Sequence, residues 1–129
     1  MGLDMYMFKA ENANEVGSDT CEEVGYWRKH PDLHSYIEEL WREAGCPNAD
    51  EAGDNPLYEF NCIEFPLTRE QLEEIRELSE EHKLPTSPGG FFFSKSAPED
   101  DPRTVEIMDK ALEMLDEDPE AVIFYYSWW

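Results

Sequence analysis

The chain has 129 residues, of which 40% are hydrophobic and 13% aromatic. This content is enough to bury one core but hardly two, so we expect a single domain over residues 1–129. Asp and Glu number 31 against 10 Lys and Arg, which gives a formal charge of -21. Binding to a phosphate backbone relies on basic residues that displace counterions, so the charge argues against direct nucleic-acid binding. Adaptation to high salt, a solvated surface and mimicry of DNA toward a basic protein all stay open as explanations of the acidity.

The sequence also bears on the cellular compartment. No apolar run reaches the roughly 20 residues that span a bilayer, and no signal-peptide pattern stands at the start. Cys21, Cys46 and Cys62 are odd in number and lack C-x-x-C spacing, which favours reduced, structural thiols. We therefore expect a cytoplasmic protein without membrane contact.

In chain order, the first predicted element is a strand over Leu3–Phe8, where apolar residues alternate with others. A polar loop separates it from a second strand over Glu23–Arg28. The spacing of apolar residues then predicts a helix that begins at Pro31, a residue tolerated at the first helical position, and ends at Gly45. A continuous helix from Thr20 is the alternative, and Pro31 would interrupt it.

The second half of the chain alternates strands with helices. Three further strands are predicted from aromatic and apolar runs: Tyr58–Phe65, Phe91–Ser94 and Ala121–Tyr126. Thr68 and Gln71 form a capping box that opens a second helix. Asp101 and Pro102 provide the cap and the first residue of a third helix. About five strands with three interspersed helices indicate a two-layer α+β domain, with a mixed or antiparallel sheet and the helices on one face.

The segment Tyr26-Trp27-Arg28-Lys29 is a local exception in this acidic chain, and it directly precedes a predicted helix. Arg28 carries a planar fork suited to phosphate or carboxylate, Lys29 adds a point charge, and the helix N-terminus adds N–H groups. Tyr26 or Trp27 could stack on a planar ligand, but alternation points them to opposite faces. The structural alternative is that Trp27 fills the core and Arg28 pairs with a carboxylate such as Asp4.

Other residue types in the chain are also able to carry chemistry. One turn into the predicted helix, His34 could bind a phosphate or act as a general acid or base, and a buried or surface histidine without ligand is the alternative. His30 stands four residues earlier, as in a metal pair, but no third ligand follows at convincing spacing, so no metal is predicted. Ser94 and Lys95 end a predicted strand and are candidates for the lip of a pocket.

Large aromatic residues gather at the end of the chain, in Phe124-Tyr125-Tyr126 and Trp128-Trp129. Such side chains are costly to leave in water. They either cap the sheet or enter a partner surface, and a homodimer through the aromatic C-terminus is one such arrangement.

A resemblance follows from four segments that occur in this order: Met1-Gly2-Leu3-Asp4-Met5-Tyr6, Glu23–Lys29 with His34 after it, Gly90–Phe93 and Phe124–Trp128. With them the chain resembles a family of small proteins found in bacteriophages and prophages. This chain departs from the family pattern at Ser94, where a glycine usually follows the Phe run. The family has no established activity, so the resemblance implies a phage setting and the cytoplasm of a host cell, and it implies no reaction.

Recognisable catalytic signatures, such as a Gly-rich phosphate loop or a nucleophile elbow, do not occur in the sequence. This favours a binding protein without a cofactor over an enzyme. The leading hypothesis is a phage- or prophage-type accessory protein that binds a small anionic, nucleotide-like ligand and so counters host defence signalling. The residues predicted to bind that ligand are Tyr26, Trp27, Arg28, Lys29, His34, Ser94 and Lys95.

Two other functions stay open. One is an acidic, DNA-mimic-like interaction protein that blocks a basic host protein. The other is a small nucleotide-processing enzyme that uses His34 together with Asp4 or a nearby carboxylate.

Overall fold

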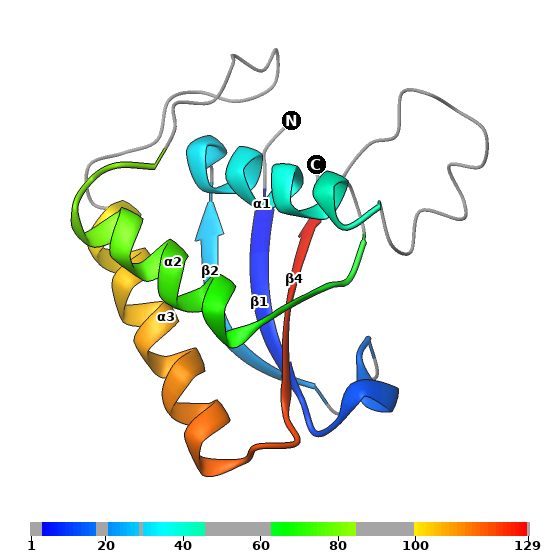
Figure 1. Cartoon of the computed structure of the whole chain (residues 1–129). Coiled ribbons are helices and arrows are strands. Elements are labelled where there is room, and N and C mark those ends of the chain that lie inside the picture. Colours follow the sequence, from blue (N-terminus) through cyan, green and yellow to red (C-terminus); the bar gives the residue numbers. More distant parts are fainter. Residues whose placement is uncertain (1–3, 18–20, 29, 46–62, 85–99, 129) are drawn as a thin grey trace.

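The computed structural model describes residues 4–17, 21–28, 30–45, 63–84 and 100–128. In these ranges, helices lie on one face of an antiparallel sheet of four strands (Figure 1). The strands are β1 (Asp4–Ala10), β2 (Glu22–Arg28), β3 (Phe65–Leu67) and β4 (Val122–Trp128), in the spatial order β2-β1-β4-β3. The helices are α1 (Pro31–Glu43), α2 (Arg69–Glu80) and α3 (Asp100–Glu117), and a short 3-10 helix, η1 (Ala13–Glu15), follows β1.

The predicted two-layer α+β architecture is confirmed, with four described strands where about five were expected. The predicted strand Phe91–Ser94 lies outside the described residues. Most of the predicted strand Tyr58–Phe65 also lies outside them. In its described part the prediction is wrong for residues 63–64, which are not in a strand, and holds for Phe65, the first residue of β3. β3 contains Pro66, which an edge strand tolerates because a missing N–H there need not interrupt a ladder.

The helices begin at or close to the residues predicted from the sequence. α1 begins at Pro31, as predicted. The capping box of α2 is present: the Gln71 backbone N–H donates to Thr68 Oγ1 at 3.2 Å, and the Thr68 N–H donates to Gln71 Oε1 at 2.9 Å. α3 begins at Asp100, two residues before Pro102, the predicted first residue, so Asp101 lies within the helix and is not its cap. None of the described helices is long and apolar enough to cross a lipid bilayer.

The hydrophobic core lies between the sheet and the three helices. Strand residues that alternate along β1, β2 and β4 point into it, and the largest buried side chains there are Trp27, Trp41 and Tyr125. Each helix contributes buried residues to the same cluster: Leu33, Ile37 and Trp41 from α1, Leu72 and Ile75 from α2, and Ile107, Met108 and Ala111 from α3. One face of the sheet is therefore covered by all three helices.

Gly25 lets α3 approach β2 closely. It pairs with Met7 in the β1–β2 ladder, next to an irregularity in the register at Met7/Phe8. A Cβ atom on Gly25 would lie 2.6 Å from three side-chain carbons of Ile107. A side chain at this position would therefore have to displace the Ile107 side chain or the helix that carries it.

We expect Gly25→Ala to lower the free energy of unfolding by about 1–3 kcal/mol, because overpacking a core forces neighbouring atoms to shift. Urea denaturation measures this quantity. Ile107→Ala removes all three contacting carbons, so the double variant should be less destabilised than the sum of the two single variants. Additive single effects would contradict the contact.

Candidate functional site

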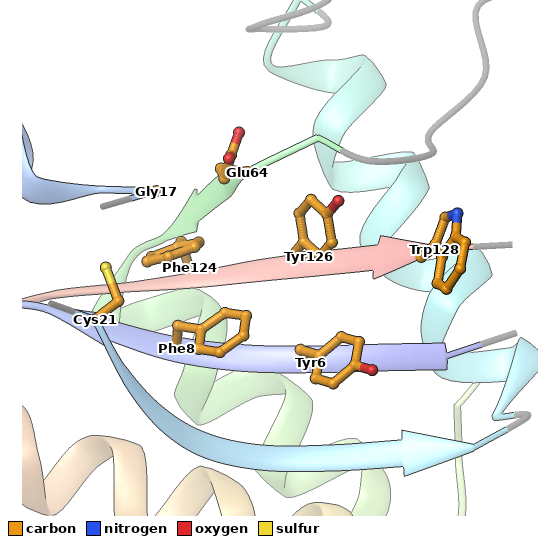
Figure 2. A pocket seen from close by; sticks show the side chains of 8 residues that line it. All are labelled: Tyr6, Phe8, Gly17, Cys21, Glu64, Phe124, Tyr126 and Trp128. Carbon is orange, nitrogen blue, oxygen red and sulfur yellow. The ribbon is translucent and has the colours of Figure 1, made fainter. Parts of the chain in front are cut away.

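Aromatic side chains line the face of the sheet opposite the helices. They occupy the strand positions between the core residues, because successive side chains of a strand point to opposite faces. Figure 2 shows Tyr6 and Phe8 on β1 and Phe124, Tyr126 and Trp128 on β4, on the near side of the sheet with the helices behind it. Together with Tyr26 of β2, we call these residues the aromatic face.

The register of the strands arranges these rings in rows. Tyr6 pairs with Tyr26 on one side and with Tyr126 on the other, at ring distances of 5.1 and 6.5 Å. In the next row Phe8 pairs with Phe124, with ring centroids 5.5 Å apart. Tyr6 and Phe8 stack along β1 at 5.7 Å. The rings therefore form one continuous surface across the three strands.

A hollow of about 500 Å³ lies over the aromatic face (Figure 2). This volume falls within the range of typical ligand sites, roughly 300–1,000 Å³. Its lining consists of Tyr6, Phe8, Gly17, Cys21, Glu64, Phe124, Tyr126 and Trp128. Trp128 is 62% exposed, whereas Phe124 is 2% exposed, so the hollow has a buried floor and an open end.

Gly17 and Glu64 meet at the rim of this hollow. Gly17 has a φ of +83°, which favours glycine, and a Cβ atom there would lie 2.9 Å from Glu64 Oε1. Cys21, also in the lining, donates its thiol to the Glu15 carbonyl oxygen at 3.2 Å. The described lining thus offers ring faces, tyrosine hydroxyls and the Glu64 carboxylate, a combination suited to binding.

The row at the end of the sheet is polar. Asp4 pairs in register with Arg28 on β2 and with Trp128 on β4. The Tyr26 hydroxyl donates to Asp4 Oδ1 at 2.6 Å. This hydrogen bond, with burial and the Asp4 charge, raises the pKa of Tyr26 to about 12, while the Arg28 charge opposes the rise. Among the described residues Asp4 is thus bonded by Tyr26, and Arg28 is exposed and forms no ion pair.

The structure separates the residues of the predicted cationic and aromatic cluster. Tyr26 and Arg28 share the aromatic face and Trp27 points the opposite way, so the predicted alternation is confirmed. Trp27 has no exposed surface, and its Nε1–H donates to Thr104 Oγ1 at 2.9 Å. Trp27 therefore belongs to the core, as the structural alternative had it, and a ligand cannot stack on it. Lys29, Ser94 and Lys95 lie outside the described residues, so their part in a site stays a prediction.

His34 lies on the helix side of the sheet, away from Tyr26 and Arg28. It is buried, and its Nδ1 lies 2.7 Å from the Tyr125 hydroxyl. Burial lowers the pKa of His34 to about 4, which leaves the ring neutral at physiological pH. The described structure therefore places His34 in a core hydrogen bond and not beside the other predicted ligand residues.

His30 precedes α1 and packs against the start of α3. Its Nδ1 lies 4.0 Å from Asp100 Oδ2, and its Nε2 lies 3.8 Å from Asp101 Oδ1. Burial lowers the pKa of His30, and the two carboxylates oppose this shift. Within the described ranges, no three His, Cys, Asp or Glu side chains are grouped so that they could hold a metal ion.

The predicted site residues did not include most of the aromatic face. Tyr6, Phe8, Tyr126 and Trp128 alternate along two strands at opposite ends of the chain, and each set alone resembles ordinary sheet packing. The alternation predicts which residues share one face of each strand, but it does not predict that the two strands pair.

Comparison with protein-family models, with curated proteins and with solved structures finds no match for this chain. The resemblance to phage and prophage proteins stays a prediction.

Asp4→Asn should lower the pKa of Tyr26 from about 12 toward its ordinary value, because the hydroxyl loses a charged acceptor. Ultraviolet titration of phenolate formation, with Tyr26→Phe subtracted, isolates this group. Arg28→Gln should raise the pKa further, since the guanidinium favours the phenolate. An unchanged pKa in Asp4→Asn would contradict the Tyr26–Asp4 bond.

Acid should destabilise the protein through His34. The unfolded chain takes up a proton near the ordinary pKa of 6.5, whereas the folded chain resists it down to about 4. The contribution of neutral His34 to stability is thus complete above pH 6.5 and is lost as the pH falls toward 4. Urea denaturation at several pH values measures how the free energy of unfolding changes with pH. His34→Gln should reduce the slope of this dependence by up to about 1.4 kcal/mol per pH unit. Tyr125→Phe is the matched control and should keep the slope, because burial, and not the bond to Tyr125, lowers the pKa of His34. An unchanged slope in His34→Gln would contradict the lowered pKa of His34.

Proposed function

We propose that this protein is a non-catalytic interaction protein whose aromatic face binds a basic protein partner. The observation that carries the proposal is the continuous aromatic surface on the side of the sheet opposite the helices, in a chain with a formal charge of -21. The resemblance to phage and prophage proteins makes a host protein the expected partner.

The aromatic residues support an interaction surface. A contiguous apolar patch that stays accessible on a folded protein often marks a binding site, whereas single exposed apolar residues do not. Tyrosine and tryptophan are enriched among the residues that dominate binding energy, because each offers a large rigid area and a polar atom. Among the described residues, Trp128 is the one large hydrophobic side chain that is mostly exposed. It therefore has the exposure expected of an anchor residue.

The charges around the aromatic face support a basic partner. Asp4 lies in its end row beside Arg28, Glu23 pairs in register with Phe8, and Glu64 lines the hollow, so carboxylates outnumber the one cation among these described residues. Opposite charges steer association and disfavour like-charged partners. Two copies of a chain at -21 would repel each other, so a homodimer through this face is less favoured than a basic protein.

The acidic helices are a weaker candidate for the binding surface. Arg69 bonds Asp116 at 2.7 Å, and Arg76 bonds both Asp109 and Glu80. The bonds to Asp116 and Asp109 join α2 to α3, so part of the carboxylate array is neutralised within the protein. An array that mimics DNA phosphates needs its charges available to the partner.

Titration of the isotope-labelled protein with a short arginine-rich peptide tests the proposal by NMR. Chemical-shift changes should concentrate on β1 and β4, and affinity should fall as salt rises. Trp128→Ala leaves the charge unchanged and should weaken binding about tenfold or more. Glu113→Gln on the exposed side of α3 removes one charge and should have little effect. Changes centred on α2 and α3, or the absence of binding, would overturn the proposal.

A second candidate function keeps the small anionic, nucleotide-like ligand. The observation in its favour is that Arg28 shares a face with Tyr26 and a row with Trp128, so a base could stack on a ring while the guanidinium holds a phosphate. In a phage setting, capture of such a ligand would counter host signalling. The same NMR titration with mono-, di- and cyclic nucleotides distinguishes this function: shifts at Tyr26 and Arg28 that disappear in Arg28→Gln would favour it.

A further inference from the structure

We infer that the hollow on the aromatic face takes an arginine side chain of the basic partner, with its guanidinium on the rings and its charge paired with Glu64. This inference rests on the proposed function and names the partner group that the hollow recognises.

The strand pairing places Glu64 beside the rings. Glu64 directly precedes β3, whose first residue Phe65 pairs with Tyr125 of β4. Figure 2 shows Glu64 next to Phe124 and Tyr126, at the rim of the hollow. A cation held there would meet a carboxylate and aromatic faces together.

Gly17 lies close to the Glu64 side chain. The close approach between the Gly17 backbone and Glu64 Oε1 leaves no room for a Cβ atom, and Glu64 is half-buried. A half-buried side chain has less freedom to lose on binding than a fully exposed one. Because an ionised carboxylate has about four lone-pair sites, Glu64 can accept a new donor in addition to the interactions it already makes.

The chemistry of the lining selects a guanidinium. This group is planar, stacks on aromatic rings, bonds a carboxylate through two N–H groups and is more weakly hydrated than an ammonium. A phosphate or carboxylate would meet the like charge of Glu64. A neutral ring would stack, but it would offer Glu64 no charge.

The chain contains the same combination elsewhere. On α1 the Arg42 guanidinium lies 5.4 Å from the centroid of the Trp41 ring, and Arg42 Nε lies 3.6 Å from Glu38 Oε2. Arginine, an aromatic ring and a carboxylate thus meet within this protein. The hollow offers the ring and the carboxylate and lacks the arginine among its described lining residues.

The test compares two capped tripeptides, Gly-Arg-Gly and Gly-citrulline-Gly, which differ in charge and share a planar end group. NMR titration of the full chain follows the Trp128 indole and Tyr126 ring signals. We expect the arginine peptide to bind about tenfold more tightly. Glu64→Gln should bring the ratio of the two affinities to about one, and Glu113→Gln, which removes an equal charge on α3, should keep the ratio. If Glu64→Gln fails to fold, Glu64→Asp retracts the carboxylate and should lower the ratio as well.

Equal affinities of the two tripeptides, or a ratio that Glu64→Gln leaves unchanged, would overturn this inference. If the longer arginine-rich peptide still binds the aromatic face in that case, the proposed function stands without the arginine site. If the longer peptide does not bind that face, both proposals fail.

Discussion

The pairing of β1 with β4 is the constraint on which the rest of the structure depends. These strands come from opposite ends of the chain and form the centre of the sheet, with every residue from Asp4 to Ala10 in register with one of β4. The register decides which residues face the helices and which form the aromatic face. A slip by one residue would exchange the two sets, so the core and the candidate site are fixed by the same hydrogen bonds.

Neighbouring residues of one type have opposite roles as a result. Tyr125 is buried against His34, while Tyr126 lines the hollow on the other side of the sheet. Trp27 is a core residue bonded to Thr104, while Trp128 is largely exposed. The role of an aromatic residue in this chain therefore depends less on its type than on the face of the sheet to which its side chain points.

Local physical rules explain what the sequence could predict. Alternation assigned Tyr26 and Trp27 to opposite faces, and the capping box located the start of α2. The candidate site depends instead on which strands pair, and the local sequence pattern of β1 or β4 does not predict the partner strand. Glu64 was missed for a related reason: it was assigned to a strand, whereas it precedes β3 and turns toward the rim of the hollow.

The position of β4 has a consequence for synthesis on the ribosome. β4 is the last described element in the sequence, yet it stands between β1 and β3 and pairs with both. β1 and β2 can pair directly, but β3 cannot be joined to them in the native sheet until β4 has left the exit tunnel. Up to that moment the nascent chain exposes the apolar side of β1 without its central partner, and its contacts of long sequence separation form last.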